Sequence, residues 1–187
     1  IAVIVMDAHG EYSSFGEPVV SGGARDFSSR TKVVKAQNIK IGVPKLSVGL
    51  IASIVSGLSE PQKRDLQKVL DSLSQKMREG EGPFDLAKVK TAILESADVK
   101  TKEGLLSWIS ALESLNLFSR TDLPSISDIV KPGQLTVVDL SDLVDLKKKQ
   151  VIVSYFASRL FNDRRNNKVS PFLLVVEEAH QFCPEKV

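Results

Sequence analysis

Several features that mark other protein classes are scarce or absent in this sequence. Cys183 is the only cysteine, which excludes a disulfide scaffold and a cysteine-based zinc site within the chain, and a reducing cytoplasmic location is expected. No run of about 18 or more uncharged apolar residues exists, so neither a membrane span nor a membrane partner is expected. The opening apolar run reaches Asp7 at once without a basic n-region, so a signal peptide is not expected either.

The residues that are present are those of an ordinary globular protein. The chain has 187 residues, 42% of them hydrophobic and 26% charged, which fits one α/β domain or one domain with an insertion. The formal net charge of +2 does not by itself indicate a nucleic-acid partner.

Three apolar runs predict strands that are buried on both faces of a parallel sheet. They cover residues 1–7, 135–140 and 172–176, and a helix over about 146–166 separates the last two. A strand, a helix and a second strand in this order form a βαβ unit, which implies parallel pairing. Residues 17–44 contain short Val and Ile pieces broken by Gly, Ser and Asn, and we interpret them as a loop or irregular hairpin.

The middle of the chain predicts a helical bundle. A helix capped by Ser59, with Gln62 placed for a capping box, carries an apolar stripe, and a second helix over 84–97 carries another. Thr101 is expected to cap a third helix. The expected core positions of the first two helices are Leu66, Val69, Leu70, Leu73, Met77, Leu86, Val89, Ile93 and Leu94. The predicted organisation is an α/β fold in which residues 44–125 form an all-helical insertion between 1–43 and 126–187.

Acidic residues follow the predicted strands. Asp7, Asp139 and Glu177 each stand at the end of an apolar run, and ligand sites of parallel sheets lie beyond the carboxyl ends of the strands. The apolar run 172–176 followed by Glu177 and Glu178 has the Walker B pattern, in which the first acid holds Mg²⁺ through water and the second polarises the attacking water. On this pattern alone, a strand that runs into an exposed polar loop is an equally good interpretation.

Three motifs, taken together and in order, resemble the HerA group of the HerA–FtsK hexameric ATPases, the archaeal and bacterial DNA translocases. They are DAHGEY at 7–12, KPGQLTVVDLSDL at 131–143 and LLVVEEAHQFCPE at 173–185. The resemblance covers residues 1–12 and about 131–187, and this family carries a helical insertion at the corresponding place. It implies a partial RecA-like parallel sheet, ATP and Mg²⁺ as cofactors, a homo-hexamer, double-stranded DNA as substrate in DNA end processing, and a nuclease partner of the NurA type.

The resemblance also implies roles for individual residues. Glu177 would hold Mg²⁺ through water, Glu178 would be the catalytic carboxylate, and Asp7, His9 and Glu11 would lie beside the nucleotide. His180 would support the site or hydrogen-bond a loop backbone. The phosphate loop GxxxxGK[ST] and the arginine finger of the family are absent from these residues, so we expect a fragment that binds ATP poorly by itself.

The loop after DAHGEY is the candidate DNA contact. Its basic residues are Arg25, Arg30, Lys32, Lys35 and Lys40, which form a solvated surface under the simpler interpretation. Two further alternatives stay open. One is a metal-dependent hydrolase or nuclease that binds Mn²⁺ or Zn²⁺ directly through the Asp, His and Glu clusters at 7–11 and 177–180. The other is a non-enzymatic protein whose helical bundle binds a partner.

Overall fold

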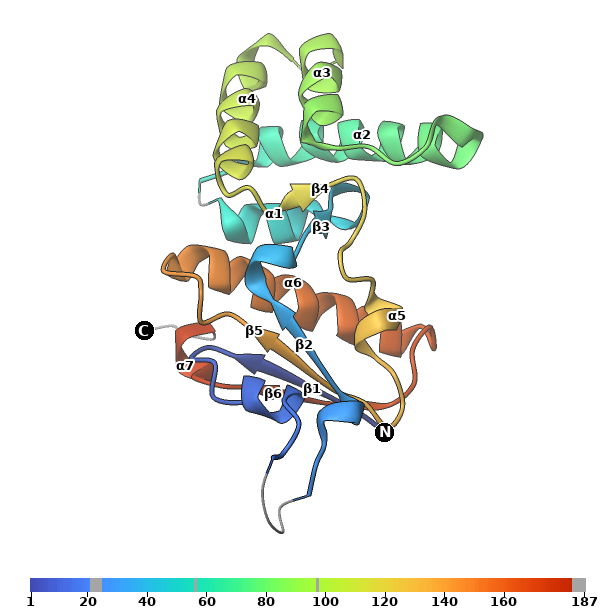
Figure 1. The fold of residues 1–187 in the computed structure, drawn as a ribbon. Helices are drawn as coiled ribbons and strands as arrows, with labels where there is room; N and C mark the ends of the chain where they lie inside the picture. Colours follow the sequence, from blue (N-terminus) through green and yellow to red (C-terminus); the bar gives the residue numbers. More distant parts are fainter. Residues whose placement is uncertain (21–24, 56, 97, 183–187) are drawn as a thin grey trace. The chain divides into compact units, whose positions relative to one another are not determined.

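The chain folds into two compact units. The computed structural model describes residues 1–20, 25–55, 57–96 and 98–182. Unit 1 comprises residues 1–39 and 124–187, and unit 2 comprises residues 40–123 (Figure 1).

Unit 1 is built on a four-stranded parallel sheet with the order β2-β5-β1-β6. The strands are β1 (Ala2–Asp7), β2 (Thr31–Lys35), β5 (Leu135–Asp139) and β6 (Phe172–Val176). The three predicted strands and their parallel pairing are therefore confirmed. The interpretation of 17–44 as a loop or hairpin is wrong for Thr31–Lys35, because this segment pairs with β5, about a hundred residues further along the chain.

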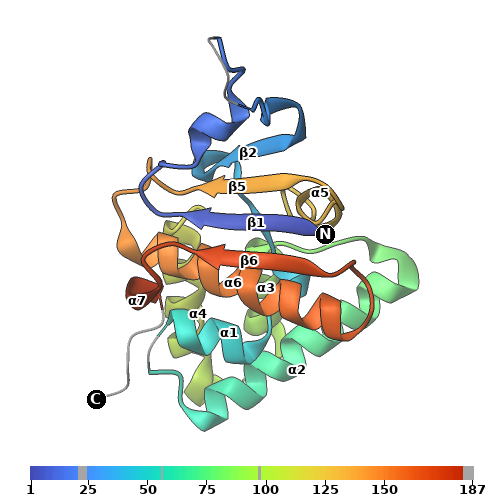
Figure 2. The ribbon, with the colours of Figure 1, turned by 90° about the horizontal axis from the view of Figure 1, so that it is seen from below.

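Two helices of unit 1, α5 (Ile126–Ile129) and α6 (Leu146–Arg165), lie on one side of this sheet, and Figure 2 shows α6 behind β6. The short helix α7 (Ala179–Phe182) follows at the carboxyl end of β6. Asp145 caps α6 by accepting hydrogen bonds from the backbone N–H groups of Lys147 and Lys148. The predicted helix is confirmed, and it buries a set of large side chains that includes Val151, Ile152, Tyr155, Phe156 and Leu160.

The two faces of the sheet have different neighbours. Side chains alternate between faces along a strand, and Thr136 donates its hydroxyl to the backbone oxygen of Ile129 in α5. On the opposite face, Ser13 of the 3-10 helix η1 (Ser13–Gly16) donates to Asp139. The register places Lys35, Asp139 and Asp7 in one row across this second face, at the carboxyl ends of their strands.

One edge of the sheet is formed by β6. Within the described residues β6 pairs only with β1, and none of its five apolar residues is fully buried. Leu173 leaves 53% of its surface exposed.

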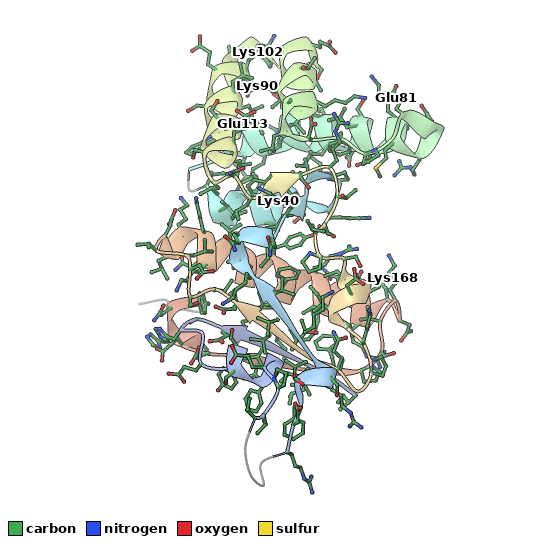
Figure 3. All side chains as sticks on the ribbon, in the orientation of Figure 1. Lys40, Glu81, Lys90, Lys102, Glu113 and Lys168 are labelled. Atoms are coloured by element: carbon green, nitrogen blue, oxygen red, sulfur yellow. The ribbon has the colours of Figure 1, made fainter. Side chains whose placement is uncertain are left out.

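Unit 2 consists mainly of four helices. They are α1 (Val48–Ile54), α2 (Glu60–Lys76), α3 (Leu86–Ser96) and α4 (Val99–Ser114), with the 3-10 helix η4 (Val43–Lys45) before them and the π turn η5 (Met77–Glu81) after α2. The predicted capping box of α2 is present, since Ser59 and Gln62 bond each other's backbone N–H groups. Lys90 of α3 and Glu113 of α4 form an ion pair at 3.7 Å (Figure 3).

Unit 2 is not purely helical. The short strands β3 (Ile41–Gly42) and β4 (Phe118–Ser119) pair in parallel. Beside them, Lys40 and Leu123 exchange two backbone hydrogen bonds of 2.8 and 2.9 Å, so the first and last residues of the unit are joined to each other.

Three details of the predicted helices are wrong. Asp98, and not Thr101, caps α4, because the helix begins at Val99 and places Thr101 in its first turn, where its hydroxyl bonds Asp65 at 2.7 Å. Leu94 is 51% exposed, and Met77 lies in η5 and is only half-buried. In the described ranges, no helix is long and apolar enough to cross a membrane.

Candidate nucleotide site at the carboxyl edge of the sheet

The carboxyl edge of the unit 1 sheet gathers the acids that follow the strands. The register aligns Asp7 with Asp139, and the backbone N–H of Glu177 donates to the backbone oxygen of Met6, which places Glu177 beside Asp7. The topology therefore brings the ends of DAHGEY, VVDLS and VVEEAH to one place.

Asp7 is fully buried and organises the loop that follows β1. Its Oδ1 accepts backbone N–H groups from His9 at 3.3 Å, Gly10 at 2.7 Å and Glu11 at 3.2 Å, and its Oδ2 accepts that of Tyr12 at 3.0 Å. Both oxygens are thus occupied by the chain itself. Asp7 shapes the loop 8–12 and has no exposed oxygen with which to touch a nucleotide directly.

Glu177 connects β6 to the same loop. Its Oε2 accepts the backbone N–H groups of Ala8 at 2.8 Å and His9 at 3.3 Å. Burial raises the pKa of the Glu177 carboxyl, and the neighbouring Asp7 carboxyl raises that pKa further. Glu177 is therefore an inward-facing acid that shares its environment with a second carboxyl group.

Asp139 is held by side chains from three segments. Lys35 Nζ lies 2.6 Å from its Oδ2, which also accepts the Ser13 hydroxyl, while Ser141 donates its hydroxyl at 2.6 Å and its backbone N–H at 2.9 Å to Oδ1. Burial alone would raise the pKa of Asp139, but the hydrogen bonds from Lys35, Ser13 and Ser141 outweigh it and hold the pKa well below its usual range. The charge of this acid is thus neutralised within the chain.

Glu178 differs from the other acids of this edge. Its backbone is left-handed, with φ of 51°, which is uncommon for a residue with a Cβ atom and marks local strain. Its side chain is 37% exposed, and its Oε2 lies 3.4 Å from Nδ1 of the exposed His180. Unlike the buried Asp7 and Asp139, Glu178 is therefore an acid that a ligand can reach at the end of its strand.

His9 and Glu11 are exposed on the loop after β1. Their backbone N–H groups bond to Asp7, so the loop geometry is fixed while both side chains face solvent. The structure brings these two residues to the same edge as Glu178.

Two residues of α6 also reach this edge, and sequence reasoning missed them. Lys149 Nζ donates to the backbone oxygen of Ala8 at 2.9 Å, and Gln150 Nε2 donates to that of Gln181 at 2.8 Å. Both contacts join residues that are far apart in the sequence. The only available signal was their place at the start of the helix after β5.

The five basic residues proposed for DNA do not form one group. Lys35 is paired with Asp139, and Lys40 belongs to unit 2, where its Nζ bonds the backbone oxygen of Asn116 at 2.8 Å. Arg25 and Arg30 are exposed and Lys32 is half-buried. Lys35 and Lys40 therefore have internal partners that a DNA phosphate would have to replace.

The donor set of this edge suits one kind of metal site. Among the residues that the structure describes, no group of three or more His, Cys, Asp or Glu side chains is arranged to hold a metal ion. Direct binding of Mn²⁺ or Zn²⁺ by such a cluster therefore has no support in the described part of the chain. Mg²⁺ usually binds one or two carboxylates together with substrate phosphates and water. The two carboxylates of Glu177 and Glu178 are enough for a site of that kind.

Comparison with known proteins decides the family. A family model described as the central domain of the helicase HerA matches residues 1–160. The chain belongs to this family. The resemblance seen in the sequence motifs is thus confirmed, and the chain is part of a HerA-type P-loop ATPase. The match ends within α6, before Glu177 and Glu178.

A solved structure agrees with this assignment at the level of the fold. The HerA-type chain is similar to VirB4 of Thermoanaerobacter pseudethanolicus, with a TM-score of 0.64 at 13% sequence identity. The match covers 97% of this chain and 76% of that chain. No curated protein matches the sequence.

Proposed function

We propose that this HerA-type domain carries the acidic side of an ATPase site that drives translocation of double-stranded DNA. The observation that carries the proposal is the placement of Glu178, an accessible carboxylate held in a left-handed backbone directly beyond a parallel strand. Nucleotides bind at this edge of parallel α/β sheets, and strained backbone is concentrated at functional sites.

Glu178 would act as the acceptor that orients and polarises the water attacking the γ-phosphate. Glu177 would face the water shell of Mg²⁺ while its Oε2 stays bonded to the loop after β1. Bound Mg²⁺ supplies positive charge to the phosphate oxygens. Asp7 and Asp139, whose oxygens are occupied by the chain, would hold the loops that present His9 and Glu11 to the nucleotide.

The substitution that tests this role is Glu178→Gln in the complete protein that contains this domain. We expect ATP turnover to fall by about a hundredfold or more while ATP still binds, because a carboxamide preserves the shape but cannot accept the proton. Turnover and equilibrium nucleotide binding are measured on the same preparation. Glu103→Gln, on the exposed surface of α4, is the matched control. Near-normal hydrolysis by Glu178→Gln would remove this residue from the mechanism.

DNA binding would use the cations of the segment before β2 and of the start of β2. Arg25, Arg30 and Lys32 remain candidates because none of them forms a salt bridge in the described part of the chain, whereas Lys35 does. They would contact phosphates without distinguishing bases, as a translocase requires. A homo-hexamer and a nuclease partner of the NurA type are further parts of this proposal that rest on the family.

Arg30→Gln is expected to weaken DNA binding equally across sequences. The slope of log affinity against log salt concentration should fall by about one unit, the value for one lost phosphate contact. Lys40→Gln is the control, since Lys40 is bonded within unit 2 and should leave the slope unchanged. An unchanged slope for Arg30→Gln would mean that this cation only solvates the surface.

A further inference from the structure

The backbone of Glu178 is fixed on both sides by contacts with other segments. Before it, Glu177 is bonded to the N–H groups of Ala8 and His9, and after it, Gln181 is bonded through its backbone oxygen to Gln150. Gln181 also donates its backbone N–H to the backbone oxygen of Glu178 at 2.8 Å. The left-handed residue therefore lies between two anchored points.

The first of these anchors is itself held by α6. The peptide groups around Ala8 are bonded from two sides, with the Ala8 N–H to Glu177 at 2.8 Å and the Ala8 oxygen to Lys149 Nζ at 2.9 Å. Ala8 is only 1% exposed, so it has little room to shift. Lys149 and Gln150 are adjacent in α6, so one turn of one helix supports both loops.

A left-handed backbone at a residue with a Cβ atom persists only when its surroundings impose it. Glycine or asparagine would adopt the same φ at lower cost, as Asn116 does in unit 2 with φ of 52°. Here the residue is a glutamate in a loop with few other restraints. The hydrogen bonds that Lys149 and Gln150 of α6 donate to Ala8 and Gln181 hold the segments on either side of this residue and can impose this conformation.

We propose that Lys149 and Gln150 are positioning residues, which hold Glu178 in its left-handed conformation and so aim its carboxylate at the edge where the nucleotide would bind. The functional part rests on the proposed ATPase role of Glu178. The conformational part concerns only contacts within this chain. The two parts can therefore be tested separately.

The conformational part is tested by a double-mutant cycle in the 187-residue chain. Glu178→Gly should lower the unfolding equilibrium constant by about tenfold, because glycine carries no Cβ penalty at positive φ. In a Gln150→Leu background, the restraint on Gln181 is lost. There, Glu178→Gly should lower the unfolding equilibrium constant by only about threefold or less. Urea denaturation measures all four proteins.

The matched cycle pairs Gln150→Leu with Asn116→Gly, which alters a left-handed residue in unit 2. These two changes should be additive. Full additivity of Gln150→Leu with Glu178→Gly would overturn the proposal, because it would mean that α6 does not impose the strain.

The functional part is tested by ATP turnover in the complete protein. Lys149→Met and Gln150→Leu should each lower kcat by about tenfold or more with little change in KM for ATP, since they misplace Glu178 without removing a binding group. Lys149→Arg, which keeps a cationic donor, should recover most of the rate. Lys147→Met, an exposed neighbour on the same helix, should retain the wild-type rate.

The two experiments separate the two possible failures. Wild-type kcat in both α6 variants, together with coupling in the cycle, would overturn the positioning of catalysis by α6 and leave the role of Glu178 intact. Loss of rate in Lys149→Met that Lys149→Arg does not recover would show a general structural defect and would also count against the proposal. A protein in which even Glu178→Gln hydrolyses ATP normally would refute the proposed function itself.

Discussion

The loops that follow β1 and β6 leave the same edge of the sheet but are held in different ways. After β1, the buried Asp7 accepts four backbone N–H groups, and Glu177 accepts that of Ala8 and shares that of His9 with Asp7. After β6, Glu178 is partly exposed, has a left-handed backbone and is restrained by a few contacts around it. Asp7 and Glu178 therefore differ: the oxygens of Asp7 accept hydrogen bonds from the chain itself, whereas the carboxylate of Glu178 is accessible to a ligand.

This difference separates acids that build the site from acids that can do chemistry in it. A carboxylate whose oxygens accept backbone N–H groups stabilises a loop. If a ligand replaced those hydrogen bonds, the loop would lose the contacts that hold its conformation. An accessible carboxylate on a residue with a strained backbone can instead accept hydrogen bonds from a ligand or a water molecule. Substitutions along this edge should therefore affect stability at Asp7 and Asp139 and activity at Glu178.

The largest effect on stability is expected from Asp7→Asn. An amide has a single acceptor oxygen. With that oxygen in the Oδ1 position, the backbone N–H of Tyr12 loses its acceptor inside a buried site and faces the amide NH₂ group, so we expect a loss of about 3 kcal/mol in the free energy of unfolding. Urea denaturation measures this loss. Asp26→Asn is the control, because Asp26 is exposed and accepts the backbone N–H of Ser28 at the surface. If both variants lose the same small amount, the loop after β1 does not depend on Asp7.

An intermediate effect is expected from Asp139→Asn, and it should depend on pH. The folded-state pKa of Asp139 is depressed, so its contribution is fully present above its unfolded pKa, near 4, and is lost as pH falls through the lower folded pKa. At pH 7 we expect the variant to be about 1–2 kcal/mol less stable, since one charge-assisted bond to Lys35 is weakened.

The measurement for Asp139 is the stability difference between wild type and variant from pH 7 down to pH 3. The difference should shrink with falling pH. A difference that stays constant throughout would show that the charge of Asp139 is not what Lys35, Ser13 and Ser141 stabilise.

The smallest effect is expected from Glu177→Gln, and its sign should be opposite. The folded-state pKa of Glu177 is raised, so its ionised form is disfavoured at pH 7, and stability increases as the group is protonated at lower pH. The glutamine oxygen can still accept the Ala8 N–H. The variant should equal or exceed wild-type stability at pH 7, by less than about 1 kcal/mol, and this advantage should vanish toward pH 4. A clear loss of stability at pH 7 would mean that the ionised carboxylate is required to hold the loop.

The sequence was sufficient for the parts of the fold that depend on local pattern. The three apolar strands, α6 and the capping box of α2 all follow from periodicity and capping chemistry. The topology rule for parallel sheets then brought Asp7, Asp139 and Glu177 to one edge. The strand β2 was missed because TKVVK is short, has lysines at two of its five positions, and is recognised as a strand only through its pairing with β5.

The partners of the acids could not be predicted for a related reason. Lys35 and Ser13 reach Asp139 across 104 and 126 residues of sequence, and nothing local distinguishes these side chains from solvated ones. Its charge and its place in the loop after DAHGEY make Lys35 a candidate DNA contact, whereas in the structure it is paired with Asp139. The left-handed φ of Glu178 was equally invisible, because it is imposed by tertiary contacts and not by residue type.

The bonded ends of unit 2 have a consequence for how this chain tolerates its insertion. Closing a loop costs conformational entropy that grows with the separation of its ends along a flexible chain. Lys40 and Leu123 are hydrogen-bonded to each other, so the two points at which the chain enters and leaves unit 2 lie as close together as the ends of a tight turn. Once unit 2 has folded, the entropy cost to the sheet is that of a very short loop, so the length of the insertion could change in evolution with little effect on the pairing of β2 with β5.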